Sequence, residues 1–291
     1  MAEQNKNLWI TSRFDIDLRR PKVMAIVNVT PDSFSDGGQH AGTAAALRHC
    51  EKLIKEGADI LDIGGESTRP GSPVVPLDEE LRRVLPVVRE AIRFQVPISV
   101  DTYKPEVMQA VLDEGADIIN DIWALRQGHA VDVVAAHPRC GVCLMHMHRE
   151  PQTMQAAPMA GDVLGPVIDF LNERVHTLAA RGVEAARITV DPGIGFGKTV
   201  EQNFSLLARQ SQVQAATGCA VLAGWSRKSS LGRVTGHDDP KDRVAASIAA
   251  ALLAVERGAS VVRVHDVRAT VDALTVLRNV SDTAFFACQS R

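Results

Sequence analysis

Eight short apolar runs, each followed at once by polar residues, recur along the chain and constrain its fold more than any other feature. The runs occupy residues 23–27, 59–63, 98–100, 117–119, 141–144, 188–190, 219–224 and 261–264. The segments between them are long enough for a loop and a helix, and several carry apolar residues at helical spacing. Gly57, Gly115, Gly182 and Gly258 precede four of the runs, as expected where a helix ends and the chain turns into a buried strand.

An iterated strand–helix unit with continuous apolar strands indicates a parallel sheet that is covered on both faces. We predict an α/β fold, the (β/α)8 TIM barrel, because eight units close a barrel and 291 residues suit its usual size of about 250. A doubly wound open sheet is the alternative, but the first strand is not followed by the glycine-rich dinucleotide motif of that fold. We expect an N-terminal extension, residues 1–22, packed on a single barrel domain, residues 23–291.

Composition argues against several classes of protein. The net charge of −3 and the scattered cations give no footprint for nucleic acid or a membrane surface. No apolar run approaches the ~20 residues of a membrane span, and the N-terminus lacks the apolar core of a secretory signal. Five cysteines without framework spacing favour reduced thiols and a cytoplasmic location. Cys140-x-x-Cys143 and His146-x-His148 each resemble half of a zinc site, but neither has a partner pair at matching spacing.

Local signals give expectations for helices and loops. Thr43 is a common N-cap type before an amphipathic stripe, so we expect a helix over residues 44–56. Pro86 lies inside a second stripe and is expected to kink or split that helix. One helix is expected over residues 203–215. The loops at residues 30–42 and 64–77 are long and rich in Gly, Ser, Asp and Pro, which is typical of lids over a site.

Polar residues at the expected strand ends define the candidate site, because barrel enzymes bind their substrates at the carboxyl ends of the strands. Asp101, Asn120 and Asp191 end strands three, four and six, and Lys228 follows strand seven. Carboxylate and amide groups together suit a flat heterocycle with an amidine-like edge. Capping of the next helix is the structural alternative for each of the strand-end residues.

A second polar group lies on the last strand and predicts an anion site. Arg263 and His265 are two residues apart and so share one face of that strand. With Asn28 across the barrel closure, they outline a place where barrels commonly hold phosphate. Pairing of Arg263 with a nearby acid is the alternative. Met145 and Phe196 are expected to be core or an apolar wall for a flat ring.

Seven segments, in chain order, resemble the motifs of bacterial dihydropteroate synthases. They are NVTPDSFSDGG (28–38), DIGGESTRPG (62–71), DTYKP (101–105), ND (120–121), DPGIGFGK (191–198), SRKS (226–229) and RVHD (263–266). The resemblance extends over residues 23–280, and seven ordered matches are far more specific than any one of them. It implies a homodimeric (β/α)8 barrel that joins 4-aminobenzoate to 6-hydroxymethyl-7,8-dihydropterin diphosphate, forming dihydropteroate and diphosphate for folate synthesis.

The resemblance also implies roles for individual residues. The pterin would be bound by Asp101, Asn120, Met145, Asp191, Phe196 and Lys228. The diphosphate would be bound by Asn28, Thr68, Arg69, Arg263 and His265. The aminobenzoate would be bound by Phe34, Thr68, Pro70, Lys228 and Ser229. Asn28 would contact the cofactor Mg²⁺, and the catalytic set would be Asp101, Lys228, Arg263 and His265. Sulfonamides, which share an aniline and an anion with aminobenzoate, would compete with it.

The chemistry of the residues agrees with this reaction. An arylamine is a weak nucleophile, so catalysis is best directed at stabilising the negative charge that develops on the leaving diphosphate. Three alternatives remain: a methyltetrahydrofolate-handling methyltransferase on the same barrel, a non-catalytic pterin-binding protein, and a phosphate-binding barrel isomerase. The last would explain Arg263 and His265 but would leave Asp191 and Asn120 without a role.

Overall fold

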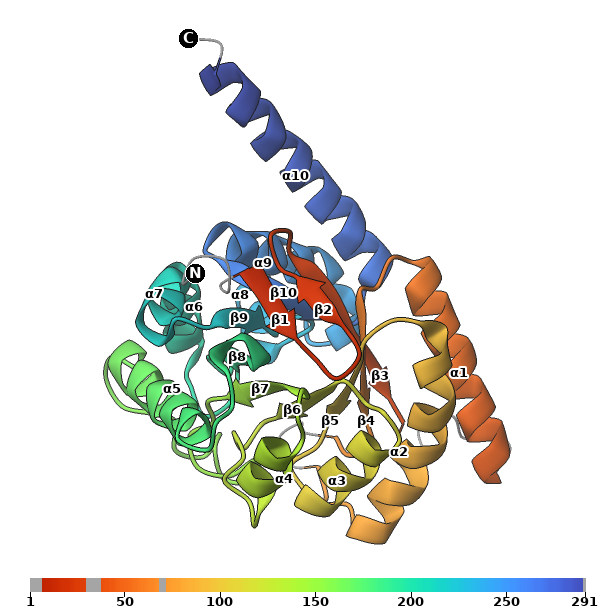
Figure 1. Ribbon diagram of the computed structural model, residues 1–291. Helices are drawn as coiled ribbons and strands as arrows, with labels where there is room; N and C mark the ends of the chain where they lie inside the picture. Colours follow the sequence, from red (N-terminus) through yellow and green to blue (C-terminus); the bar gives the residue numbers. More distant parts are fainter. Residues whose placement is uncertain (1–6, 30–37, 68–71, 290–291) are drawn as a thin grey trace.

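The computed structural model describes residues 7–29, 38–67 and 72–289, and its centre is a closed barrel of eight parallel strands (Figure 1). The strands are β3 (Lys22–Asn28), β4 (Ile60–Gly64), β5 (Ile98–Asp101), β6 (Ile118–Asp121), β7 (Gly141–Met145), β8 (Ile188–Asp191), β9 (Ala220–Ala223) and β10 (Ala259–Val264). Each pairs with its sequence neighbour, and β10 closes the barrel against β3. The predicted (β/α)8 fold is confirmed.

Helices surround the barrel on its outside (Figure 1). They are α1 (Gly38–Lys55), α2 (Leu77–Ala91), α3 (Pro105–Asp113), α4 (Ala130–Ala136), α5 (Leu164–Ala179), α6 (Val200–Ala208), α7 (Gln210–Thr217), α8 (Ser229–Thr235), α9 (Val244–Glu256) and α10 (Val267–Gln289). Short 3₁₀ turns cover Ile92–Phe94, Ala185–Arg187 and Pro240–Arg243. The main apolar core lies between this helical layer and the outward-facing strand residues, while α10 continues away from the body of the molecule.

Two helix predictions are wrong, and a third is wrong in part. Thr43 lies inside α1, which begins at Gly38, because an N-cap preference of about 1 kcal/mol does not by itself fix where a helix starts. Pro86 does not split α2, since Val84, Val87 and Val88 are fully buried and their packing holds the helix together, whereas a kink at Pro86 stays a prediction. The helix expected over residues 203–215 is instead two helices, α6 and α7, which meet at Arg209.

A small hairpin lies at the amino ends of the barrel strands. Its strands β1 (Leu8–Ile10) and β2 (Asp15–Asp17) are antiparallel, and Trp9 is fully buried against inward-facing strand residues. The Trp9 indole N–H donates to the carbonyl of Arg187 at 3.0 Å. Arg13 and Asp117 add an ion pair of 2.5 Å before β6. The division of the chain into an extension and one barrel domain stays a prediction.

The strand register brings the polar strand ends to one level. Asn28 is paired with Gly64, Gly64 with Asp101, and Asp101 with Asn120, so three adjoining strand pairs end together. On the other side of the barrel, Met145 is paired with Asp191. A site at this rim is therefore a consequence of where each apolar run stops. Among the helices of the described residues, none is long and apolar enough to cross a bilayer.

Candidate active site

A cavity of ≈ 300 Å³ lies at the carboxyl ends of the strands. Ten of the residues predicted from the sequence line it: Asn28, Asp101, Asn120, Met145, Asp191, Phe196, Lys228, Ser229, Arg263 and His265. Four further predictions, Phe34, Thr68, Arg69 and Pro70, lie outside the described residues. The strand-end groups, which are up to 237 positions apart in the sequence (28 to 265), thus meet around one space.

Arg263 connects β10 to two acidic residues inside the barrel. Its Nε lies 2.6 Å from Asp62 Oδ2, and its Nη2 lies 2.7 Å from Asp101 Oδ2. Burial acts to lower the pKa of Arg263, but the charges of Asp62 and Asp101 hold it above its ordinary value. Burial raises the pKa of Asp101 to about 7, and Arg263 opposes that rise. Arg263 therefore both pairs with acids and lines the cavity, so the two interpretations of its role are compatible.

Asp62 was missed by the sequence reasoning, although it belongs to this network. It is fully buried in β4, and its Oδ2 also accepts a hydrogen bond of 3.1 Å from Asn120 Nδ2. One carboxylate oxygen thus holds both the Arg263 guanidinium and the Asn120 amide. The sequence signal that could have identified Asp62 is a charged residue inside an apolar strand run. Such a residue is expected to be buried, and a buried charge normally has a partner.

Asp191 is buried at the end of β8. Its Oδ1 accepts the Gly193 backbone N–H at 2.7 Å, which leaves Oδ2 to accept from a ligand. Burial raises the pKa of Asp191, while the Gly193 hydrogen bond and then the charge of Lys228 oppose the rise. Gly224 faces this carboxylate, because an added Cβ there would lie 3.7 Å from Asp191 Oδ2.

One wall of the cavity region is apolar. Its buried cluster consists of Ile122, Met145, Met147, Met154 and Phe196. The Lys228 ammonium lies 4.3 Å from the centre of the Phe196 ring, a cation–π distance. A flat ligand placed here would contact thioether and aromatic groups on its faces and polar groups at its edges.

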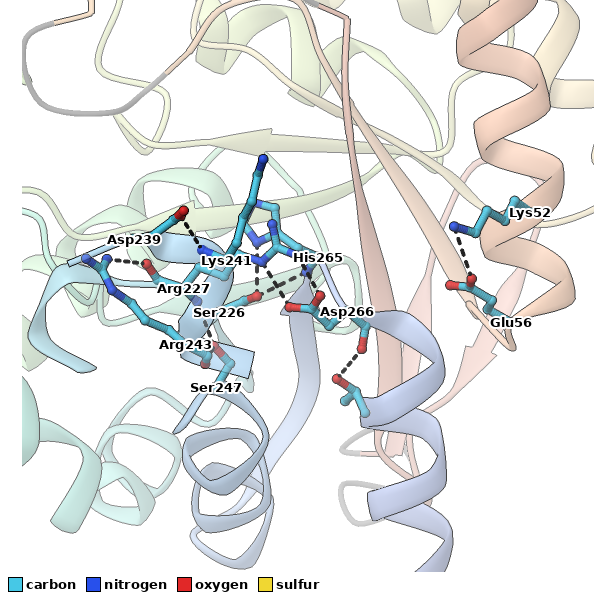
Figure 2. A network of polar contacts seen from close by, with 11 residues as sticks. Lys52, Glu56, Ser226, Arg227, Asp239, Lys241, Arg243, Ser247, His265 and Asp266 are labelled. Carbon is cyan, nitrogen blue, oxygen red and sulfur yellow. Dashed lines mark hydrogen bonds and ion pairs between the residues drawn. The ribbon is translucent and has the colours of Figure 1, made fainter. Parts of the chain in front are cut away.

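The segment after β9 is fixed against the end of β10. Ser226 Oγ lies 3.0 Å from His265 Nδ1 and accepts the His265 backbone N–H at 3.1 Å (Figure 2). Arg227 has a φ of 59° and forms two hydrogen bonds with Asp266, of 2.6 and 3.0 Å. These contacts set the direction in which the chain continues into Lys228 and Ser229.

Arg243, which the sequence reasoning also missed, supports the same turn. Its Nη1 donates to the Arg227 carbonyl at 3.0 Å and its Nε donates to the His237 carbonyl at 2.9 Å. Ser247 Oγ accepts the Arg227 backbone N–H at 2.9 Å (Figure 2). The two ends of the segment that contains α8 are therefore held by one buried guanidinium.

Comparison with known proteins identifies the family of this chain. The family of pterin-binding enzymes matches residues 24–265. The dihydropteroate synthase of Neisseria meningitidis serogroup B is 49% identical over 275 residues, 93% of this chain and 96% of the relative. The chain belongs to the pterin-binding enzymes, among the dihydropteroate synthases.

Two solved structures of that family are also similar to this chain. The structure of Burkholderia cenocepacia dihydropteroate synthase complexed with 7,8-dihydropteroate has a TM-score of 0.86 at 52% identity, covering 95% of this chain and 97% of that one. The Xanthomonas albilineans enzyme with 4-aminobenzoic acid has a TM-score of 0.86 at 51% identity, covering 92% and 95%.

An ion cluster fixes the start of the segment after β4 in this pterin-binding enzyme. Lys104 Nζ forms ion pairs with carboxylate oxygens of both Glu66 and Glu80. Glu80 also accepts from Thr102 Oγ1 at 2.7 Å, and Glu66 accepts from Tyr103 Oη at 3.0 Å. Glu66 lines the cavity, so this cluster ties part of the cavity wall to β5 and α2.

Proposed function

We propose that the cavity binds 6-hydroxymethyl-7,8-dihydropterin diphosphate and 4-aminobenzoate and joins them to give 7,8-dihydropteroate and diphosphate. The observation that carries the proposal is the single cavity lined by acidic, amide, cationic and apolar groups from strands all around the barrel. The enzyme would be a transferase that moves a pterinylmethyl group to an arylamine. A methyltransferase or a non-catalytic binding protein would not release diphosphate when given both substrates, which separates those alternatives.

The pterin ring would lie against the apolar wall, with its polar edges toward Asp101, Asn120 and Asp191. Asp191 Oδ1 already accepts the Gly193 N–H, so Oδ2 is the oxygen that would accept hydrogen bonds from the amidine-like N–H groups of the pterin. Asn120 Nδ2 donates to Asp62, so its carbonyl oxygen is the atom that would accept from the ligand. Met145, Phe196 and Lys228 would contact the ring from their positions around Asp191.

The diphosphate would lie toward Asn28, Arg263 and His265, and toward Thr68 and Arg69 outside the described residues. In the reaction the C–O bond to diphosphate breaks, and its electron pair leaves with the diphosphate. Arg263 and His265 would stabilise that negative charge in a site partly removed from water. The buried Asp101 carboxylate would stabilise the positive charge left on the pterin methylene group.

The aminobenzoate would bind beside Lys228 and Ser229, with Phe34, Thr68 and Pro70 on the same side by resemblance. Its amine nitrogen bonds to the methylene carbon and then loses one proton. Because the chain holds both reactants in one cavity, the arylamine competes with water at a high effective concentration. Exclusion of water by the surrounding loops would protect the cationic carbon from hydrolysis.

Mg²⁺ is the cofactor that we propose for this site, with Asn28 as its protein ligand. Asn28 is an exposed residue at the rim and lines the cavity. Among the described residues no group of three His, Cys, Asp or Glu could hold a metal ion. Mg²⁺ commonly binds through one protein oxygen, waters and substrate phosphates, so a single amide fits it. Mg²⁺ would neutralise negative charge on the diphosphate.

Formation of dihydropteroate from both substrates, measured with and without Mg²⁺, tests the function directly. Asp191→Ala should abolish detectable pterin binding in calorimetry, since its carboxylate is the principal acceptor. The exposed Asp113→Ala serves as a matched control and should bind pterin normally. Unaltered pterin affinity in Asp191→Ala would contradict the assignment of the pocket.

We further propose that the enzyme is a cytoplasmic homodimer. Cys50, Cys140, Cys143 and Cys219 are free and buried, which suits a reducing compartment. Exposed apolar side chains on α9 and α10, Leu253, Val276 and Val280, support association with a second copy. Light scattering coupled to size-exclusion chromatography would test this, and a monomer at micromolar concentration would contradict it.

A further inference from the structure

A buried lysine lies behind the cavity without a carboxylate among its hydrogen-bond partners. Lys198 is 3% exposed, and its Nζ contacts four acceptors. They are His146 Nδ1 at 2.9 Å, the Gly193 carbonyl at 2.9 Å, the Phe196 carbonyl at 3.2 Å and the His146 carbonyl at 3.4 Å. Burial lowers the pKa of Lys198 to about 7, although the charge of Asp191 opposes that change. Keeping this side chain buried is therefore costly, which indicates that the arrangement has a role.

Two of these carbonyls belong to the loop between β8 and α6. Gly193, Gly195 and Gly197 have φ values of 71°, 82° and 70°, conformations that other residues rarely adopt. A Cβ on Gly193 would lie 1.8 Å from the His146 carbonyl oxygen, and one on Gly197 would lie 2.7 Å from His148 Cβ. The loop therefore lies directly against the segment that follows β7.

His146 is the partner of Lys198 on the β7 side. Burial and then the Lys198 charge lower the pKa of His146 to about 2, so its ring is neutral and Nδ1 can accept from Lys198. The ring meets Phe170 edge-on, at 5.0 Å between centres and 88° between planes. The His146 backbone N–H donates to the Asp191 carbonyl at 2.9 Å, which links the same residue to the end of β8.

The loop that Lys198 holds carries two parts of the pterin site. Phe196 belongs to the apolar wall, and Gly193 donates its N–H to the Asp191 carboxylate. Because Lys198 binds the carbonyls of both Gly193 and Phe196, it fixes the ring and the carboxylate relative to each other.

We propose that Lys198 is a positioning residue for the pterin: its ammonium, bonded to His146 and to the carbonyls of Gly193 and Phe196, sets the spacing between the Phe196 ring and the Asp191 carboxylate. The proposal rests on the function proposed above, in which these two groups bind the pterin. Lys198 acts through the loop and itself lies outside the cavity lining, whereas Lys228 lines the cavity.

Lys198→Met tests this role, because methionine preserves an unbranched chain but donates no hydrogen bonds. The KM for the pterin diphosphate should rise about tenfold or more, as for the loss of a buried charge-assisted hydrogen bond. The KM for aminobenzoate should stay within about threefold of the wild-type value, because a change of that size is too small to reflect a lost contact. The exposed Lys55→Met is the matched control and should leave both constants unchanged. Equal increases in both KM values, or an unchanged pterin KM, would overturn the proposal.

A pair of His146 variants keeps the test valid if Lys198→Met does not fold. His146→Phe keeps a ring against Phe170 but removes the acceptor for Lys198. His146→Asn keeps an acceptor near the position of Nδ1. The Phe variant should show the selective rise in pterin KM, and the Asn variant should remain close to wild type. If the pterin KM values of the two variants do not differ, the positioning role of Lys198 is contradicted.

The measurements also separate this proposal from the function on which it rests. Dihydropteroate formation by the wild-type enzyme reports on the function alone. The ratio of pterin KM values between variant and wild type reports on Lys198 alone, and a thermal melt of each variant shows whether a lost fold accounts for a lost activity.

Discussion

Arg263 donates from Nη2 to Asp101 Oδ2 across 2.7 Å, which joins the last strand of the barrel to its third. The same guanidinium donates from Nε to Asp62 at 2.6 Å. These two carboxylates hold the cation in place at the cavity before any anion arrives. An arginine fixed in advance loses little conformational freedom when it binds a phosphate group, which favours binding of the diphosphate.

Removal of this cation should discriminate between ligands with and without a diphosphate. Arg263→Ala is expected to weaken binding of the pterin diphosphate by about 1.5–3 kcal/mol more than binding of free pterin, which is roughly 10- to 150-fold. Arg263→Lys, which keeps the charge but not the planar fork, should lose only part of that difference. Calorimetric titration of both ligands measures it, and equal losses for the two would contradict an anion-binding role.

Asp62 should contribute to stability through its charge. Asp62→Asn leaves Arg263 with one carboxylate in place of two and is expected to lower the free energy of unfolding by about 3 kcal/mol. The double variant Asp62→Asn, Arg263→Met also removes the cation that has lost one of its two carboxylates, and it should recover part of the loss. A double-mutant cycle in urea should give a coupling on the order of 0.5–3 kcal/mol, and strictly additive effects would rule out the pair as a stabilising contact.

The strand ends could be predicted from the sequence because they are local features. An apolar run that stops at Asp101 or Asp191 marks the end of a strand, and in a parallel barrel all such ends gather at one rim. The residues that line the cavity could be predicted from that rule together with the family resemblance. α8, in contrast, was not predicted, because seven residues are too few for a helical period to stand out.

Contacts between strands that are distant in the sequence could not be predicted from local sequence patterns. Asp62 and Arg263 are 201 positions apart, and nothing in either segment states that their side chains point into the same barrel interior at the same height. Lys198 was identified only as the last residue of the DPGIGFGK segment, and its partners could not be predicted because most of them are backbone carbonyls that the sequence does not display. Packing geometry, and not residue type, decides such contacts.

Asp121 should give the stability of the protein a recognisable pH dependence. Burial raises its pKa from 3.8 to about 7, although the backbone N–H groups of Trp123 and Leu125, each at 2.7 Å, oppose this. Between these two pH values the native carboxyl keeps a proton that the unfolded chain has lost. Its stabilising contribution is therefore fully present below about pH 4 and is lost as the pH rises through 7.

Asp121→Asn isolates that contribution, because the amide does not titrate. The stability difference, wild type minus variant, should shrink by up to about 1.4 kcal/mol for each pH unit between 5 and 7. Urea denaturation of both proteins at pH 5, 6 and 7 provides the values. If the stability difference between wild type and variant instead grew with pH, the hydrogen bonds from the two backbone N–H groups would outweigh the effect of burial on the pKa and keep the native carboxylate ionised.

The Arg227–Asp266 pair should control the aminobenzoate side of the site. A non-glycine residue at φ 59° stores about 1–3 kcal/mol of backbone strain, which persists only while its partners hold it. Asp266→Asn weakens the two hydrogen bonds to Arg227, so the turn should relax and redirect Lys228 and Ser229. The KM for aminobenzoate is expected to rise on the order of tenfold. Asp272→Asn, an exposed acid on α10, serves as the control. An unchanged aminobenzoate KM, measured in a variant whose thermal melting point has fallen, would assign the pair to stability alone.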